Sequence, residues 1–313
     1  MDLRDALDEL RDVPAAVAGV SVAGARDVAA KGTDEFSCFR IASLTKAVTS
    51  AALVLALRSR GVPLDTPAIT LLPALGPDWR ARTDITVAQI LGQVAGLRES
   101  VTAANVASLP LAEAARLVVR AGSERVPGAR WSYYNGNYFL AGAILAGLDD
   151  TTFEKALAAR LLGPWGMSRT GFATPAKAIG GWDGPEALPA IDYPPSRRPS
   201  GGLWSCVPDL LSLGEGLLRE PAALAAIRRR QTTEHDPMAY GLGWALGPSG
   251  QMYLNGRLPG YRAAMLLIPD REYVSVVLTA QQRALPAAAN LLSDLQRPLT
   301  GDDLSAAVDE FAA

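Results

Sequence analysis

The chain has 313 residues, of which 49% are apolar and 20% are charged, and this balance predicts a folded protein with one large domain or two lobes. Its formal net charge of −2 gives no electrostatic basis for binding nucleic acid or an anionic membrane. The single histidine excludes most histidine-based metal sites and makes a Ser-His-Asp triad depend on His235 alone.

The first residues, 1–14, are charged and predict a short amphipathic helix. Since they lack the basic start and apolar core of a signal peptide, we expect no secretory signal. No apolar run approaches the roughly 20 residues that a membrane-spanning helix requires. We therefore expect a cytoplasmic protein in which Cys38 and Cys206 stay reduced.

Two short strands, at 15–25 and 27–32, are expected next, followed by a long apolar helix over about 43–60. That helix begins with the sequence SLTK. Residues at positions i and i+3 share one helix face, so the hydroxyl of Ser43 and the amine of Lys46 can touch.

This pair has the composition of a nucleophile and its base. A serine hydroxyl is a weak nucleophile until a neighbouring base removes its proton, and Lys46 is the candidate base because no histidine adjoins Ser43. An exposed lysine has a pKa of about 10.4, so Lys46 must be desolvated or lie near another cation. The apolar residues 47–57 provide such burial. Taken alone the tetrad is weak evidence, since this spacing also arises by chance.

The region 61–199 has a helical pattern with many Gly/Pro turns and contains the tripeptide Tyr133-Tyr134-Asn135 before a helix of small residues. Tyr133 in this tripeptide is a candidate for a functional role; the alternative is that the aromatic residues of this segment only pack beneath a turn. After a Pro/Gly-rich connection, two helices, three strands and two final helices are expected. They lie at 208–219, 222–230, 240–246, 261–269, 272–280, 286–296 and 302–312. This order predicts an α+β protein whose antiparallel sheet is built from both chain ends.

The serine-lysine tetrad, the later Tyr-x-Asn and a Gly-x-x-Pro-Gly-Tyr turn together resemble the serine β-lactamase and penicillin-binding-protein superfamily, in its class C and family VIII esterase branch. The resemblance runs from about Val13 to about Ala280. It implies an antiparallel sheet flanked by helices, formed by 1–60 and 200–313, with an inserted all-helical lobe at 61–199.

The resemblance also implies roles for individual residues. Tyr133 would relay protons between Ser43, Lys46 and the leaving group, while Asn135 would hydrogen-bond Lys46 or the acyl side of the substrate. Gly256 and Arg257 would come from the sheet edge. The backbone N–H groups of Ser43 and Arg257 would form the oxyanion hole.

Two positions depart from the family pattern. Leu254 stands where relatives carry the Lys or His that helps to hold a substrate carboxylate, and Gln93 stands where they commonly have His. The missing cation argues against efficient cleavage of β-lactams and favours esters or amides without that carboxylate. Arg257 is the candidate to restore a positive charge; the alternative is an exposed arginine at a strand end.

The leading hypothesis is a serine hydrolase that cleaves a small-molecule ester or amide through an acyl-Ser43 intermediate, with no cofactor and no metal. The first alternative is a biosynthetic acyltransferase that passes the same acyl group to an amine or alcohol. The second is a catalytically silent binding protein, for which the departures at Leu254 and Gln93 are the support. The oligomeric state is left open.

Overall fold

Seven antiparallel strands form the main sheet, in the order β2-β1-β11-β10-β9-β8-β7. The computed structural model describes residues 2–189 and 192–311. The strands are β1 (Ala16–Val22), β2 (Ala25–Lys31), β7 (Ala239–Tyr240), β8 (Ala245–Leu246), β9 (Met252–Leu258), β10 (Tyr261–Ile268) and β11 (Tyr273–Thr279). Because β1 pairs with both β2 and β11, the two ends of the chain share one sheet, which confirms the predicted α+β arrangement.

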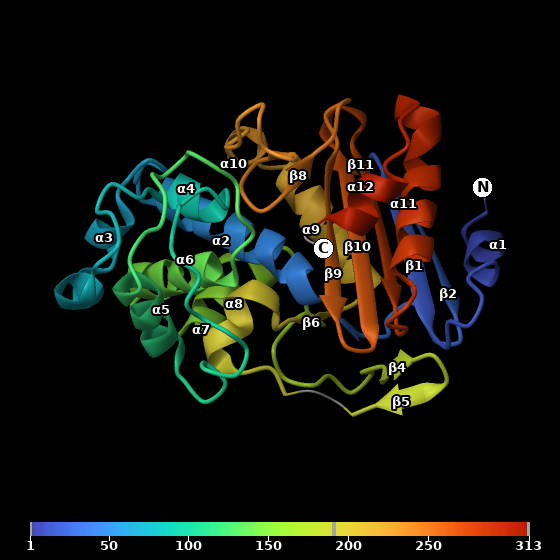
Figure 1. The fold of residues 1–313 in the computed structure, drawn as a ribbon. Coiled ribbons are helices and arrows are strands. Elements are labelled where there is room, and N and C mark those ends of the chain that lie inside the picture. The colour runs from blue at the N-terminus through green and yellow to red at the C-terminus, as the bar shows by residue number, and fades with distance from the viewer. Residues whose placement is uncertain (1, 190–191, 312–313) are drawn as a thin grey trace.

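Helices cover both faces of this sheet (Figure 1). On one face α9 (Val207–Leu218) packs against β1 and β11. The other face carries α1 (Leu3–Asp8), α11 (Leu285–Thr300) and α12 (Ser305–Glu310). The helix expected at 302–312 corresponds to α12, which is shorter than predicted. Position 312 lies outside the described residues.

The helix α2 (Thr45–Ser59) leads from the sheet into a group of helices. Twelve of its 15 residues are buried, because its many small side chains let neighbouring helices approach on every side. These neighbours are α6 (Asn135–Leu148), η3 (Ala158–Leu162), α8 (Arg198–Gly201) and α10 (Pro221–Arg228). The remaining helices of this part are α3 (Ala68–Leu71), η2 (Pro73–Asp78), α4 (Val87–Leu91), α5 (Leu111–Arg120) and α7 (Phe153–Leu157). Among the described residues, none of these helices is long and apolar enough to span a membrane.

The prediction of one strand at 240–246 was wrong. Residues 239–246 instead form two strands of two residues each, β7 and β8, joined by a turn. The turn contains Gly243, whose φ of +85° lies in the left-handed region that breaks a continuous strand. The connection after residue 170 also contains three short strands and a helical turn. These are β4 (Gly181–Asp183), β5 (Glu186–Leu188), η4 (Pro195–Arg197) and β6 (Trp204–Ser205), which pairs with β3 (Phe39–Arg40).

The second half of β9 borders the start of α2. β8 pairs only with Met252 and Tyr253 of β9, so within the described part of the chain residues 254–258 have no strand on that side. The 3-10 helix η1 (Ala42–Leu44) lies there instead. A Cβ atom at Gly256 would lie 2.3 Å from the carbonyl oxygen of Ile41. The absence of a side chain at Gly256 therefore lets the sheet edge touch the turn that precedes Ser43.

We expect Gly256→Ala to lower the free energy of unfolding by about 1–3 kcal/mol, because the new methyl group meets backbone rather than a flexible side chain. Thermal and chemical unfolding measure this change. The matched control is Gly180→Ala, since a Cβ there meets nothing within 4 Å. Equal unfolding curves for the two variants would show that β9 does not depend on this close approach.

Candidate active site

Ser43 lies in a turn that is held on both sides. The preceding residue, Ala42, has a φ of +47°, an unfavourable conformation for a residue with a side chain. The turn is fixed by hydrogen bonds from Ile41 N to the Leu203 carbonyl and from Leu44 N to the Ile41 carbonyl, both 3.1 Å. Strain of this kind is retained where surrounding contacts determine the backbone, often at functional sites. The Ser43 side chain is thereby presented half-buried at the start of α2.

Lys46 lies in the first turn of α2 and contacts Ser43 of η1, as the spacing predicted, although the expected single helix from 43 begins as a 3-10 turn. Its Nζ is 3.2 Å from Ser43 Oγ and donates to the carbonyl oxygen of Ser200 at 2.7 Å. The residue is 1% exposed. Burial holds the pKa of Lys46 well below its ordinary value, and the positive charge of Arg197 lowers it further. Both conditions for a neutral lysine are met, although Arg197 was not identified from the sequence.

Tyr133 approaches the same oxygen from the start of α6. Its hydroxyl donates to Ser43 Oγ at 2.8 Å. Burial raises the pKa of Tyr133 well above its usual range, against smaller opposing effects of the Ser43 hydrogen bond and the Arg257 charge. The phenol therefore stays protonated at neutral pH. The structure thus brings Ser43, Lys46 and Tyr133 into one hydrogen-bonded group.

Gln93 holds the segment around Tyr133. Its side-chain oxygen accepts hydrogen bonds from Tyr134 N at 3.1 Å and from Asn137 Nδ2 at 2.5 Å. Its backbone carbonyl accepts from Ser132 N at 2.9 Å. The residues on both sides of Tyr133 are therefore fixed by this glutamine. In the sequence Gln93 was only a departure from the family pattern, because its partners lie about 40 positions further along the chain.

Asn135 is less closely joined to the group. It is exposed at the start of α6, and none of the hydrogen bonds of residues 2–189 and 192–311 involves its side chain. Lys46 donates to Ser200 rather than to Asn135. Contact with substrate, the other role that the resemblance implies, stays a prediction for this residue.

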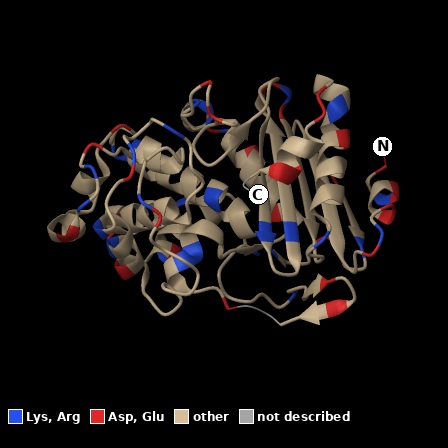
Figure 2. Ribbon diagram, viewed as in Figure 1, with Lys and Arg blue, Asp and Glu red and all other residues tan. Residues whose placement is uncertain are grey.

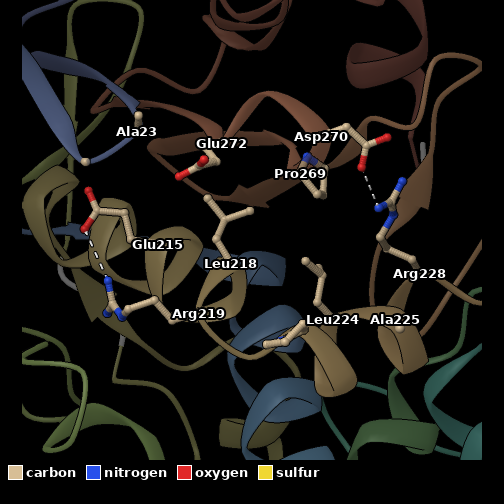
Figure 3. Close-up of a pocket in the computed structure, with 12 residues that line it drawn as sticks. Ala23, Glu215, Leu218, Arg219, Leu224, Ala225, Arg228, Pro269, Asp270 and Glu272 are labelled. Atoms are coloured by element: carbon tan, nitrogen blue, oxygen red, sulfur yellow. Dashed lines mark hydrogen bonds and ion pairs between the residues drawn. The ribbon is translucent and has the colours of Figure 1, made fainter.

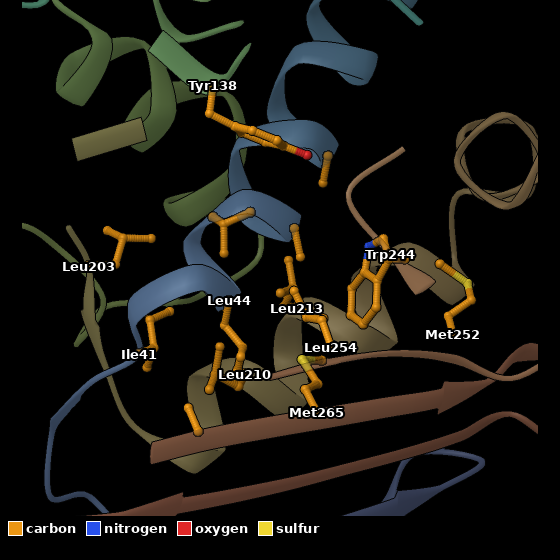
Figure 4. Close-up of a cluster of buried hydrophobic side chains, with 14 of the residues drawn as sticks. Ile41, Leu44, Tyr138, Leu203, Leu210, Leu213, Trp244, Met252, Leu254 and Met265 are labelled. Carbon is orange, nitrogen blue, oxygen red and sulfur yellow. The ribbon is translucent and has the colours of Figure 1, made fainter. Parts of the chain in front are cut away.

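Leu254 and Arg257 point to opposite faces of β9, as strand side chains three positions apart must. Leu254 is 1% exposed and packs in the apolar cluster that includes Leu44 and Met265 (Figure 4). The Arg257 side chain instead donates to the carbonyl of Asp309, in the helix α12 that packs on β9. The arginine therefore does not replace the missing cation at Leu254, although its charge favours ionisation of Tyr133.

The backbone N–H of Arg257, unlike its side chain, is directed toward the Ser43 side of β9. Leu258 and Tyr261 flank a two-residue turn and are paired in the ladder, as are Arg257 and Arg262. Because hydrogen-bonded and non-hydrogen-bonded pairs alternate between antiparallel strands, the N–H of Arg257 points away from β10. It faces the open edge of β9, on the side where η1 and Ser43 lie.

Other cavities lack this chemistry. The pocket in Figure 3 lies between α9, α10 and the turn before β11, and its walls include Leu218 and Leu224. Four of its charged residues form ion pairs, Arg228 with Asp270 at 3.1 Å and Arg219 with Glu215 at 4.0 Å. Acidic and basic residues are interspersed over the face seen in Figure 2. Among the described residues, no three His, Cys, Asp or Glu side chains gather in a way that would hold a metal ion.

Comparisons with known proteins agree with the fold. Protein flp of Staphylococcus aureus (strain N315) is 23% identical over 260 residues, which cover 77% of this chain and 52% of flp, so the chain spans about half the length of this curated relative. A class C beta-lactamase superposes with a TM-score of 0.82 at 16% identity, covering 96% of this chain and 97% of its own. EstCE1, a hydrolase with promiscuous acyltransferase activity, gives 0.72 at 17% identity, covering 90% and 92%.

The family model named Beta-lactamase matches residues 3–296. This match confirms the resemblance drawn from the sequence motifs, and the superpositions confirm the β-lactamase/transpeptidase-like fold. The chain therefore belongs to the beta-lactamase family.

Proposed function

We propose that this protein is a serine hydrolase that cleaves a small-molecule ester or amide through an acyl-Ser43 intermediate. The observation that carries the proposal is the pair of contacts at Ser43 Oγ, with the Lys46 amine at 3.2 Å and the Tyr133 phenol at 2.8 Å. Their pKa values are shifted in opposite directions. One group is suited to accept a proton at neutral pH and the other to donate one.

Acylation then follows from this arrangement. Neutral Lys46 takes the proton of Ser43 as Oγ attacks the substrate carbonyl carbon, and the N–H groups of Ser43 and Arg257 stabilise the oxyanion. As the bond to the leaving group breaks, Tyr133 gives its proton to the departing oxygen or nitrogen. Lys46 returns its proton to Tyr133, so both groups regain their starting states and Ser43 carries the acyl group.

Deacylation uses the same groups with water as the nucleophile. Lys46 accepts a proton from the attacking water, the bond between Ser43 Oγ and the acyl carbon breaks, and Oγ regains a proton through Tyr133. The balance is one ester or amide plus one water, giving an acid and an alcohol or amine. No metal or redox cofactor enters either step.

The substrate class follows from the lining of the site. Leu254 offers no charge to a carboxylate, and the Arg257 side chain is held by the Asp309 carbonyl on the other face of β9. We therefore expect poor turnover of penicillins and better turnover of compounds without a carboxylate at that position. Asn135, which is exposed, is the candidate contact for the acyl side of the substrate.

Acyl transfer is the second candidate function. Tyr133 contacts the nucleophile and Trp131 lies beside Tyr133, with ring centroids 6.2 Å apart. Aromatic surface of this kind disfavours water at the acyl-enzyme. EstCE1, which shares the fold, is a hydrolase with promiscuous acyltransferase activity. Adding primary amines to an ester hydrolysis assay distinguishes the two functions, because a transferase yields acyl-amine product at the expense of free acid.

The covalent intermediate provides the first test. We expect brief exposure to p-nitrophenyl butyrate to add one butyryl group to the intact protein, detected by mass, and a penicillin to add little. Ser43→Ala should form no adduct and lose at least about a thousandfold in kcat/KM. Ser132→Ala is the matched control, since its hydroxyl lies near Tyr133 but contacts only Glu99, at 3.4 Å. An unchanged adduct in Ser43→Ala would refute the proposed nucleophile.

The pH dependence tests the assignment of base and acid. Because Lys46 must be neutral to act and its pKa is lowered, kcat/KM should rise with pH and level off well below the ordinary lysine pKa of about 10.4. Tyr133→Phe should lower the plateau by about 10²–10⁴ and leave the rising limb in place. A rate that climbs steadily beyond pH 10 with no plateau would contradict a desolvated lysine base.

Stability should respond to the same shift. The folded protein binds the Lys46 proton less tightly than the unfolded chain, so between the two pKa values the unfolded state holds more protons and stability rises with pH. We expect the wild type to gain stability relative to Lys46→Met as pH increases from about 7 toward 10, measured by chemical unfolding. Parallel curves for the two proteins would mean that the Lys46 pKa is not shifted.

A further inference from the structure

An aromatic side chain from the last described residues lies beside the proposed nucleophile. Phe311 follows α12 and is 1% exposed. Its ring meets that of Tyr133 edge-on, with centroids 5.8 Å apart and planes at 88°. The Tyr133 hydroxyl in turn donates to Ser43 Oγ. Only one side chain therefore separates the Phe311 ring from the atom that would attack a substrate.

Two further aromatic residues complete the surroundings of this ring. Tyr240 stacks on Phe311, with centroids 6.0 Å apart and planes at 3°. Trp131 lies 5.8 Å from Tyr240 and 6.2 Å from Tyr133, and its buried indole nitrogen has no partner among the described residues. We call Trp131, Tyr133 and Tyr240 the aromatic box. Edge-on and stacked contacts are the two geometries that aromatic pairs prefer.

The backbone next to Phe311 is held by polar groups of β9. The side-chain amide of Asn255, which is 2% exposed, donates to the Phe311 carbonyl at 3.1 Å and also to the carbonyl of Val308. Arg257 donates to the carbonyl of Asp309. These two residues lie on the strand whose edge carries the proposed oxyanion N–H. The box and β9 together therefore bind a ring and the carbonyl beside it.

We infer that the aromatic box is a substrate subsite for an aromatic group attached to a carbonyl-bearing chain, and that Phe311 occupies it in place of substrate. This inference rests on the proposed hydrolase with its acyl-Ser43 intermediate and specifies the substrate class of that enzyme. An aromatic substrate that places its reacting carbonyl at Ser43 needs the space next to Tyr133 that the Phe311 ring fills. The segment 305–311 must therefore leave the box before such a substrate enters.

The position of α12 is compatible with such release. The helix has six residues, and helices of this length are not stable without their tertiary contacts. It packs mainly on α11 and β9, while Phe311 supplies the contact with Tyr133 and Tyr240. Substrate and Phe311 therefore compete for one site, and removing the Phe311 ring should favour substrate.

The test measures binding without turnover. The probe is N-acetylphenylalaninamide, which carries a benzyl ring next to a carbonyl, and it is titrated by calorimetry into Ser43→Ala/Phe311→Ala. The matched protein is Ser43→Ala/Glu310→Ala, since Glu310 is exposed on the same helix and its loss leaves Phe311 in the box. We expect about tenfold tighter binding to the Phe311 variant, the gain when a site open a tenth of the time becomes fully open.

A second probe tests the aromatic class. N-acetylleucinamide has the same backbone and an apolar side chain without a ring, and we expect it to bind about tenfold more weakly because it loses two aromatic contacts. Equal affinity of the two probes, or equal affinity of the phenylalanine probe for the two variants, would overturn the inference. Phe311→Leu, which keeps an apolar side chain, replaces Phe311→Ala if the latter unfolds.

The two proposals fail in different ways. If no ester acylates Ser43 but the phenylalanine probe still prefers the Phe311 variant, the aromatic subsite stands and the hydrolase proposal falls. If Ser43 is acylated but kcat/KM for p-nitrophenyl phenylacetate, relative to the butyrate, is the same with and without the Phe311 ring, the hydrolase stands and the subsite falls. We expect instead that Phe311→Ala raises this ratio.

Discussion

The burial of the Lys46 amine beside Ser43 is the constraint on which the rest of the site depends. A charged amine in a dry interior is costly, and here desolvation, reinforced by the Arg197 charge, shifts the group toward its neutral form. The Ser200 carbonyl still provides a hydrogen-bond partner. Folding energy from the packing around α2 thus maintains a base that lysine does not provide in water. Burial of Lys46 therefore lowers the free energy of unfolding and, in the proposed mechanism, makes the amine a stronger proton acceptor at neutral pH.

Three features of the fold bring Ser43, Tyr133 and the edge of β9 to the Lys46 amine. The step from η1 into α2 brings Ser43 beside Lys46. Gln93 fixes the backbone on both sides of Tyr133, and the absence of a side chain at Gly256 lets the edge of β9 reach the turn before Ser43. The second and third of these features join segments that are far apart in sequence. The site is therefore a property of the assembled fold, and no single segment contains it.

Local patterns account for what the sequence predicted. The apolar runs that predicted β10 and β11, the spacing of Ser43 and Lys46 and the order of elements all depend on near neighbours. The cation at Arg197 and the partners of Gln93 depend on tertiary contacts, which no local pattern reports. Arg257 is a different case, because strand alternation is itself a local pattern and places this side chain opposite Leu254. The charge of the arginine suggests a replacement for the missing cation, but the direction of its side chain along β9 excludes that role.

The departure at Leu254 and the aromatic box point to the same kind of ligand. Leu254 lies in the apolar cluster below β9, the pKa of Lys46 is lowered, and the Arg257 side chain donates to a backbone carbonyl; these three side chains therefore give weak support for binding an anionic substrate. For the substrate class proposed above, binding energy comes from apolar and aromatic surface, of which one aromatic group buries about 150–250 Å². If the proposed function is right, a site without carboxylate recognition needs such a contact to orient its substrate, and the rings around Phe311 are the proposed source of it.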